Sequence, residues 1–214
     1  MSIETYILIG TMKIKKITLQ SKLFVLTAFA QSKIEEILNQ LSSLETFKDR
    51  IDYAEKHLEH LSSGSSRLIY KLPDGRVLKL AKNEKGIAQN KVEANPKMKS
   101  KYINPTIRSD KNGIWKLSPY LNKITEKEFE KLTDVNFKEF GKALEHKINK
   151  ESKPGDYDKI SKLDLFKELV RLNKDFDILI GDMIRISSWG TKDDLPILLD
   201  TGLSEKIWDK FYDT

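Results

Sequence analysis

Two acidic residues toward the end of the sequence, Asp182 and Asp200, have the setting that most clearly indicates chemistry. Each adjoins an apolar run that is short enough to be a β-strand, residues 179–180 before Asp182 and residues 196–199 before Asp200. Asp200 is followed directly by the dipeptide Thr-Gly. Because an unpaired carboxylate is too costly to bury in a core, we expect Asp200 to line a cleft and to bind a cation there.

A second region of chemical interest is the run of small residues from Ser62 to Ser66, which has one glycine at its centre. It leads into a predicted strand, residues 67–72, which a Pro-Asp-Gly turn separates from a second one, residues 77–80. This pattern predicts a β-hairpin entered through a flexible loop that is rich in exposed backbone amides. Lys79 shares a strand face with Val77, because side chains alternate along a strand with a period of two.

The remaining periodicity predicts the elements that position these residues. Apolar residues at three- and four-residue steps predict a helical region from Ser32 to His60, which Ser42-Ser43 divides into two helices in one reading. Asn95-Pro96 ends a short helix that starts near Lys85. The later predicted elements are a hairpin over residues 102–117, an extended connector over 118–122, and helices over 125–132, 136–150 and 163–174.

The N-terminal residues carry the weakest pattern. Residues 14–26 predict a strand or a short helix, and Met12 is an alternative start of the chain. Residues 12–30 loosely resemble a secretory signal, but the polar segment 20–22 interrupts their apolar run. We therefore expect a cytoplasmic protein whose N-terminal segment packs on its body. At the other end, we expect the aromatic residues 208–212 to pack the tail onto the body.

Length and composition limit the classes of protein to which the chain can belong. Its 214 residues suffice for one domain or for two small lobes. The sequence contains no cysteine, which excludes disulfides, thiolate metal ligands and a cysteine nucleophile, and which suits a reducing cytoplasm. Since it has no uninterrupted apolar run of about 18 residues, we expect no membrane-spanning helix.

The net charge of +6 is the remaining compositional signal. A basic protein can bind nucleic acid, but here the lysines alternate with aspartates and glutamates along the chain. We therefore rank a nucleic-acid-binding protein last among the functions considered and expect no nucleic-acid partner.

The order of loop, strand lysine, helix and paired acids resembles the protein-kinase-like fold, including its aminoglycoside-phosphotransferase branch. It is also similar to small kinase-like proteins of bacteriophages. The resemblance covers residues 60–205. It implies an α+β protein with a minimal bilobal fold: a helical N-terminal extension (1–58), a small β-rich nucleotide-binding lobe (59–121) and a helical lobe with the catalytic and metal-binding segment (122–214). Because few residues follow Asp200, we expect no general groove for protein substrates.

The resemblance implies an ATP site in the β-rich lobe. Residues 62–69 take the place of the glycine-rich loop G-x-G-x-x-G-x-V, in which Gly64 is retained and Arg67 stands at an outer glycine. Lys79 matches the lysine of the A-I-K strand that binds phosphate. Glu93 is implied as the partner of Lys79, with Glu84 as the alternative. The nucleotide-contacting residues implied by these matches are Ser63, Gly64, Ser65, Ser66, Lys79 and Glu93, together with Ser118 and Tyr120 of the hinge to which adenine binds.

The same resemblance assigns roles in phosphoryl transfer to the acids. The segment Ile-Gly-Asp ending at Asp182 resembles H-G-D, with Gly181 at a tight bend and Asp182 as the catalytic base. The segment beginning at Asp200 resembles D-F-G, in which the aspartate holds Mg²⁺. Ser187 stands where the family has a metal-binding asparagine, and a serine hydroxyl is a weaker and shorter ligand.

Two functions from different classes follow from these matches. The first is a kinase-like phosphotransferase that binds ATP and Mg²⁺ and acts on a small molecule, on itself or on a dedicated protein partner. The second is a pseudokinase-type binding module that engages a partner without turnover. The retained Lys79, Asp182 and Asp200 favour the enzyme, whereas the lost glycines and the serine at position 187 favour the binding module.

Overall fold

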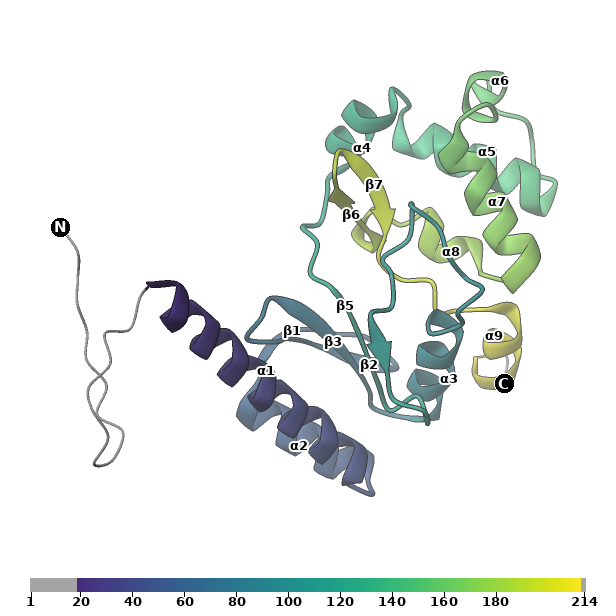
Figure 1. Cartoon of the computed structure of the whole chain (residues 1–214). Coiled ribbons are helices and arrows are strands. Elements are labelled where there is room, and N and C mark those ends of the chain that lie inside the picture. The colour runs from purple at the N-terminus through teal and green to yellow at the C-terminus, as the bar shows by residue number, and fades with distance from the viewer. Residues whose placement is uncertain (1–18, 213–214) are drawn as a thin grey trace, which may run out of the picture.

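The computed structural model describes residues 19–212, with side chains from Ala28 onward. The predictions for Met12 and for residues 14–18 lie outside the described residues. Within the described part the chain forms a β-rich lobe and a helical lobe, with a helical segment leading in from the N-terminal side (Figure 1). The α+β class and the two-lobed arrangement are as predicted, and they are consistent with a minimal bilobal kinase-like fold.

The N-terminal helical segment is a pair of helices, α1 (Leu19–Ser43) and α2 (Phe47–His57), packed against the sheet (Figure 1). The predicted division near Ser43 is confirmed. Ser42 also ties the end of α1 to the sheet, because its hydroxyl accepts a 2.8 Å hydrogen bond from Trp115 Nε1. The prediction that the helix continues to His60 is wrong, since the chain becomes extended at Leu58.

An antiparallel sheet of five strands forms the body of the first lobe, in the order β1-β2-β3-β5-β4. Neighbouring strands are antiparallel throughout, so short hairpins connect β1 to β2 and β2 to β3. In sequence order the strands are β1 (Glu59–Ser63), β2 (Arg67–Lys71), β3 (Arg76–Ala81), β4 (Arg108–Ser109) and β5 (Trp115–Pro119).

Strand β1 is absent from the sequence prediction, which has a loop leading directly into β2. Its sequence Glu-His-Leu-Ser-Ser has one apolar residue, Leu61, and its other side chains are exposed. An edge strand of this kind carries no hydrophobic alternation by which it could be recognised. The small-residue run therefore lies at the tip of the β1–β2 hairpin and not at the entrance to a single strand.

The two faces of the sheet have different partners. Leu78 and Leu80 of β3 belong to the apolar cluster that α1 and α2 cover. Val77 and Lys79, which alternate with them, face the opposite side, where helix α3 (Glu84–Glu93) packs on β3 and β5. Helix α3 was predicted over nearly the same residues, and its start is capped by Asn83, whose side chain accepts a hydrogen bond from the backbone of Gly86.

The helical lobe surrounds an aromatic core in which Phe129 lies edge-to-face on Trp189, with ring centroids 5.3 Å apart. The three long helices predicted for this region are confirmed. Its elements are α4 (Glu126–Thr133), α5 (Phe137–Asn149), α6 (Tyr157–Ile160), α7 (Asp164–Phe176), α8 (Ile180–Met183), the 3₁₀ turn η1 (Ile186–Ser188), β6 (Trp189–Lys192), β7 (Leu195–Leu198) and α9 (Glu205–Phe211).

The segment before Asp182 differs from the prediction of a strand. Ile178 makes a single bridge to Ser204, and the chain then enters the one-turn helix α8 that contains Asp182. The predicted tight bend at Gly181 is also wrong, because its φ is not positive and a Cβ built there would meet no atom within 4 Å. A short apolar run does not distinguish a strand from a helical turn.

The lobes meet where β7 passes residues 102–104. The backbone of Leu198 donates a 2.8 Å hydrogen bond to Tyr102 O, and that of Asn104 donates a 2.9 Å hydrogen bond to Leu198 O. Tyr102 and Ile103 belong to the apolar cluster of the helical lobe, although they precede β5 in the sequence. This junction holds the end of β7, and therefore Asp200, beside the sheet.

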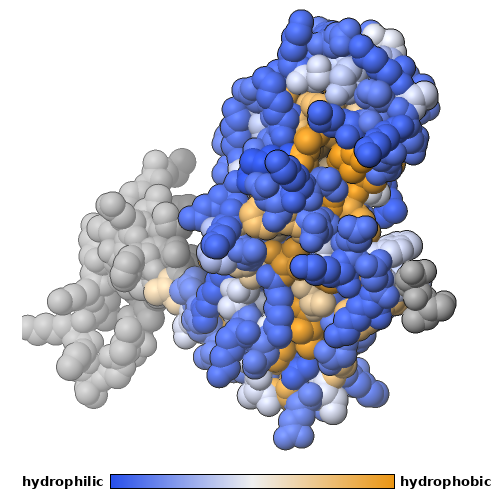
Figure 2. Space-filling view, turned by 90° about the vertical axis from the view of Figure 1, so that its right-hand side faces the viewer, coloured by the Kyte–Doolittle hydropathy of each residue, from blue (hydrophilic) through white to orange (hydrophobic). Residues whose placement is uncertain are grey.

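Most of the face shown in Figure 2 is hydrophilic, and hydrophobic residues gather in a band along its middle. In the described part of the chain, no helix combines the length and the apolar character that crossing a membrane requires.

Candidate functional site

Two adjoining cavities lie where the lobes meet, and they share Ser62, Ile69, Lys123, Ser187 and Asp200 in their linings. The first, here called the apolar cavity, has a volume of about 490 Å³ and reaches Lys79. The second, here called the loop cavity, has a volume of about 370 Å³ and lies under the tip of the β1–β2 hairpin. The apolar walls of the first come from Leu61, Ile69, Val77, Leu121 and Leu199.

An ion pair between Lys79 and Glu93 joins β3 to α3 at the edge of the apolar cavity. Lys79 Nζ lies 3.0 Å from Glu93 Oε2 and 3.1 Å from Oε1, and it donates a 2.8 Å hydrogen bond to Leu199 O. Both side chains are more than nine-tenths buried. The alternative partner, Glu84, lies exposed in the first turn of α3, at the far end of the helix from Glu93.

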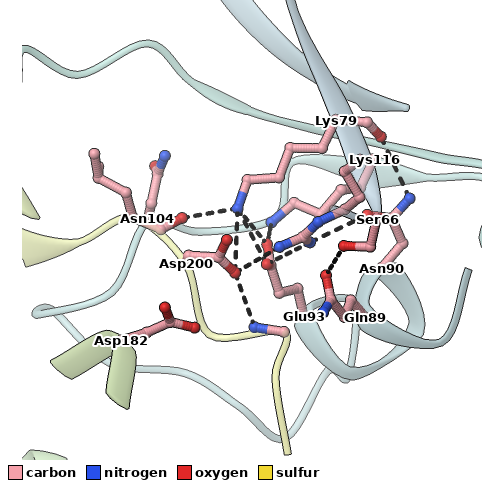
Figure 3. A network of polar contacts seen from close by, with 12 residues as sticks. Ser66, Lys79, Gln89, Asn90, Glu93, Asn104, Lys116, Asp182 and Asp200 are labelled. Atoms are coloured by element: carbon pink, nitrogen blue, oxygen red, sulfur yellow. Dashed lines mark hydrogen bonds and ion pairs between the residues drawn. The ribbon is translucent and has the colours of Figure 1, made fainter. Parts of the chain in front are cut away.

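Glu93 is surrounded by two further cations (Figure 3). Arg67 Nη1 lies 2.7 Å from Glu93 Oε1, and Lys116 Nζ binds Oε2. Burial alone would raise the pKa of Glu93, but Arg67, Lys116 and Lys79 together hold it well below its ordinary value. Burial lowers the pKa of Lys116 to about 8, against the opposing effect of Glu93.

Arg67 and Lys116 are two residues whose roles in the site were missed by sequence reasoning. Charged residues in strands usually face solvent. Their positions do carry a signal, because Arg67 alternates with Leu68 and Lys116 alternates with Leu117. Since those leucines face the apolar cluster, the two cations must face the side on which α3 and the cleft lie.

Asp200 follows β7 and is bound by the same arginine. Arg67 Nη2 lies 2.5 Å from Asp200 Oδ1, Lys79 Nζ lies 3.9 Å from it, and the backbone of Gly202 donates a 3.2 Å hydrogen bond to it. The Asp200 side chain is 38% exposed and so remains open to the cleft. Arg67 thus bridges Glu93 on α3 and Asp200 beyond β7.

Gly202 allows this close packing. A Cβ built on Gly202 would lie 2.9 Å from Glu93 Oε1 and 2.9 Å from Gln89 Cβ, which is closer than real contacts allow. Any larger residue would push the segment after Asp200 away from α3. A glycine is therefore needed at position 202 because there is no room for a side chain. Its backbone conformation does not require glycine, since its φ is not positive.

The residues around Asp200 do not fit the magnesium ion that the sequence resemblance implies. Asp200 Oδ1 is already paired with Arg67, and a divalent cation on this carboxylate would lie beside both Arg67 and Lys79. Ser187 lines both cavities but supplies only a hydroxyl. Among the described residues, no cluster of three or more His, Cys, Asp or Glu side chains is suited to hold a metal.

Asp182 reaches the loop cavity from α8 and points toward Asp200 (Figure 3). Its side chain is 14% exposed, and its described polar contact is with Arg185 Nη1 at 3.4 Å. Burial raises the pKa of Asp182 to about 6, and the nearby Asp200 contributes to the shift. A carboxyl with this pKa is largely ionised at neutral pH and can accept a proton from a hydroxyl placed in the cavity.

The residues at the hairpin tip differ in burial and in their hydrogen-bond partners. The backbone N–H of Gly64 donates to Arg67 O at 2.9 Å, which closes the turn. Ser66 is buried, and its hydroxyl donates a 2.6 Å hydrogen bond to Gln89 Oε1 on α3. Ser63 and Ser65 are exposed, and the Ser65 hydroxyl lies 3.1 Å from Tyr212 Oη. The hydroxyl of Ser66 is therefore engaged with α3, whereas those of Ser63 and Ser65 lie at the surface.

Tyr212 shows that the tail does pack on the body, as expected. Lys85 Nζ also lies 4.3 Å from the centroid of its ring. Trp208 differs from this expectation, because it is 44% exposed although its ring stacks on Tyr212.

The two predicted hinge residues differ in their relation to the apolar cavity. Tyr120 lines the cavity, whereas Ser118 is fully buried and its hydroxyl has no hydrogen-bond partner. Asn104, which sequence reasoning also missed, donates a 3.1 Å hydrogen bond to Pro119 O, and its Oδ1 is buried without a partner. Buried polar atoms without partners are uncommon and can mark a ligand contact.

No protein-family model matches the sequence, and no curated protein matches it. A solved structure of the ternary complex of streptomycin, ATP and APH(2″)-IIa is similar to 79% of this chain and to 70% of that chain. The two sequences are 14% identical over this region, and the TM-score is 0.35. A likeness of this degree supports no conclusion about function, which is argued below from the side chains of the cleft.

Proposed function

We propose that the cleft binds ATP and that the chain is a kinase-like phosphotransferase. In this proposal the adenine ring of ATP occupies the apolar cavity, and the phosphates of ATP lie toward Lys79. The acceptor hydroxyl lies in the loop cavity, where Asp182 orients it and accepts its proton. The acceptor is a small molecule, the chain itself or a dedicated protein partner.

The observation that carries the proposal is the Lys79–Glu93 ion pair at the edge of the apolar cavity. Phosphoryl transfer needs little covalent chemistry from the protein and depends on positioning and electrostatic stabilisation. A buried lysine fixed by a glutamate provides a positioned cation beside an apolar-walled cavity. Asp182, with its pKa raised to about 6, provides a proton acceptor in the adjoining loop cavity.

A second candidate is a module that binds nucleotide in the cleft and engages a partner protein without turnover. The contact between Arg67 and Asp200 favours it, because the carboxylate that would hold a metal in an enzyme of this type is already neutralised. The two candidates share the prediction that nucleotide binds, and they differ in whether the phosphoryl group is transferred.

Thermal unfolding with and without ATP tests the shared step. A ligand present at about 100 times its dissociation constant should add about 2.7 kcal/mol to the free energy of unfolding. The experiment is done on the wild type and on Lys79→Met, which removes the cation and keeps an unbranched side chain. Stabilisation of the wild type that is reduced in the variant supports nucleotide binding, and its absence at millimolar ATP contradicts both candidates.

The transfer step is tested with ATP labelled at its terminal phosphate, using the wild type and Asp182→Asn. Loss of label from ATP, or its appearance on the chain, should occur in the wild type and fall at least about 100-fold in the variant. ATP binding should persist in both proteins. Binding without any release of label in the wild type would exclude transfer to the chain itself or to water, and would favour the binding module.

A further inference from the structure

The Arg67–Asp200 contact occupies the position at which a kinase-like site would hold its metal. Arg67 Nη2 lies 2.5 Å from Asp200 Oδ1, while Nη1 lies 2.7 Å from Glu93 Oε1. The arginine side chain is 5% exposed, so the guanidinium is held inside the wall of the cleft. Its contacts are those of a permanent structural cation and not of a mobile surface side chain.

An arginine in this setting stays charged. Burial disfavours its charged form, but the carboxylates of Asp200 and Glu93 outweigh this effect and raise its pKa above the ordinary value. Charge-assisted hydrogen bonds of this length are stronger than neutral ones, and burial protects them from screening by salt. A metal ion that took Asp200 would have to displace this bond or lie beside a like charge.

The charges that line the two cavities already favour a polyphosphate. Four lining side chains are cationic and two are carboxylates, and one of those carboxylates is paired with Arg67. The cations are Arg67, Lys79, Lys123 and Arg185, and the carboxylates are Asp182 and Asp200. In a metal-dependent site the metal bridges carboxylates to phosphates, which would otherwise repel each other. Here Arg67 counters the charge of Asp200 from within the protein.

We propose that Arg67 replaces the metal ion and that the cleft binds ATP in its metal-free form. This inference rests on the nucleotide binding proposed above and names the form of the ligand. It concerns the binding step alone. It also accounts for the replacement of a glycine-rich loop residue by arginine, because a glycine at position 67 would leave Asp200 and Glu93 without this cation.

The test is a titration of ATP into the full chain by isothermal calorimetry, once in excess EDTA and once in excess magnesium. The proteins compared are the wild type, Arg67→Gln and Arg108→Gln. Glutamine removes the charge of Arg67 and keeps a polar side chain. Arg108→Gln is the matched control, because Arg108 lies in β4 outside both cavities and pairs with Glu35 on α1.

The inference expects the wild type and Arg108→Gln to bind ATP in EDTA with dissociation constants within about threefold of those in magnesium. Arg67→Gln should bind at least about tenfold more weakly in EDTA, a loss of about 1.4 kcal/mol, and magnesium should restore its binding by taking the place of the lost guanidinium at Asp200. This pattern would establish Arg67 as the substitute for the metal.

Each other outcome contradicts either the inference, the role of Arg67 or the proposed function. Wild-type binding that requires magnesium overturns the inference and leaves the proposed function standing. Equal EDTA affinities for the wild type and Arg67→Gln overturn the role of Arg67. Absence of ATP binding in both conditions overturns the proposed function, and the inference with it. If Arg67→Gln does not fold, the wild-type comparison still decides between metal-free and metal-dependent binding.

Discussion

Lys79 Nζ and Glu93 Oε2 lie 3.0 Å apart, and this ion pair fixes the distance between β3 and α3 at the wall of the cleft. The pair is one part of a buried cluster in which Glu93 also binds Arg67 and Lys116. Because Arg67 continues to Asp200, the position of α3 is linked to the segment that follows β7. The geometry of the cleft therefore depends on the charge of Glu93.

Replacing Glu93 by glutamine should strongly destabilise the protein. The substitution keeps the shape of the side chain but leaves Arg67, Lys79 and Lys116 buried without their shared counter-ion. Breaking a buried ion pair by removing one partner costs about 3–5 kcal/mol, so we expect a loss of this size in the free energy of unfolding measured with urea. Glu84→Gln, at the exposed start of the same helix, should change it by less than about 1 kcal/mol. Similar losses in both variants would contradict the buried cluster.

Much of the fold follows from the sequence because its main elements have a strong apolar period. The stripe along α1 and α2 and the alternation in β2, β3 and β5 predict elements that the structure confirms. Strand β1 and the turn α8 have no such pattern. Both are held by contacts that are distant in the sequence: β1 by pairing with β2, and α8 by packing in the helical lobe. No local rule could have predicted them.

The residues of the site likewise fall into those that the sequence predicts and those that it does not. Spacing and residue type bring Lys79, Glu93 and Asp200 into consideration, and the structure has these side chains in one cluster. Arg67 was interpreted from the sequence as a departure from a glycine-rich loop. Its role as a bridge depends on Asp200, which lies far along the chain, and on the register that turns Arg67 toward α3. The local sequence indicates the strand face on which Arg67 lies, but it does not indicate that Asp200 is its partner.

The stability difference between Asp182→Asn and the wild type should depend on pH. The pKa of Asp182 is raised from 3.8 to about 6 on folding, so its ionised form opposes folding. The stability that protonation of Asp182 confers is complete below pH 4 and is lost as the pH rises through 6. We therefore expect the variant to be more stable than the wild type by about 2–3 kcal/mol at pH 8. The difference should shrink steadily as the pH falls from 7 to 4.

Urea unfolding at a series of pH values measures this difference, and other titrating groups cancel because both proteins contain them. Asp209→Asn, at an exposed position of α9, is the control and should differ from the wild type by less than about 0.5 kcal/mol at every pH. A difference for Asp182→Asn that does not change between pH 8 and pH 5 would show that this carboxyl is not held in a desolvated setting.

Gly86 and Gly181 should respond oppositely to alanine. A Cβ on Gly86 would lie 2.2 Å from Ser66 O and 3.0 Å from Ala81 Cα, so alanine would force α3 away from the hairpin tip. Overpacking of this kind costs about 1–3 kcal/mol or more, which a thermal unfolding curve detects. Gly181→Ala should cause no loss, because nothing lies within 4 Å and alanine favours a helical turn. A destabilised Gly181→Ala would restore the predicted tight bend.

The helices α1 and α2 should prove to be part of the β-rich lobe and not a separable extension. Leu38 of α1 is fully buried and belongs to the same apolar cluster as Leu78 and Leu117 of the sheet. Truncating such a side chain removes buried apolar surface and leaves a cavity, so Leu38→Ala should lower the free energy of unfolding by about 2–5 kcal/mol. Phe29→Ala, on an exposed part of the same helix, should change it by less than about 0.5 kcal/mol.

The shape of the transition distinguishes the two arrangements. If α1 and α2 share the core of the sheet, Leu38→Ala should shift a single cooperative transition to lower urea, with the same midpoint by helical circular dichroism and by tryptophan fluorescence. Trp115 makes fluorescence sensitive to this interface, because its ring nitrogen donates to Ser42 at the end of α1. An early loss of helical signal at an unchanged fluorescence midpoint would show that the helices unfold on their own. In that case they would not help to hold the strands that carry Arg67 and Lys79.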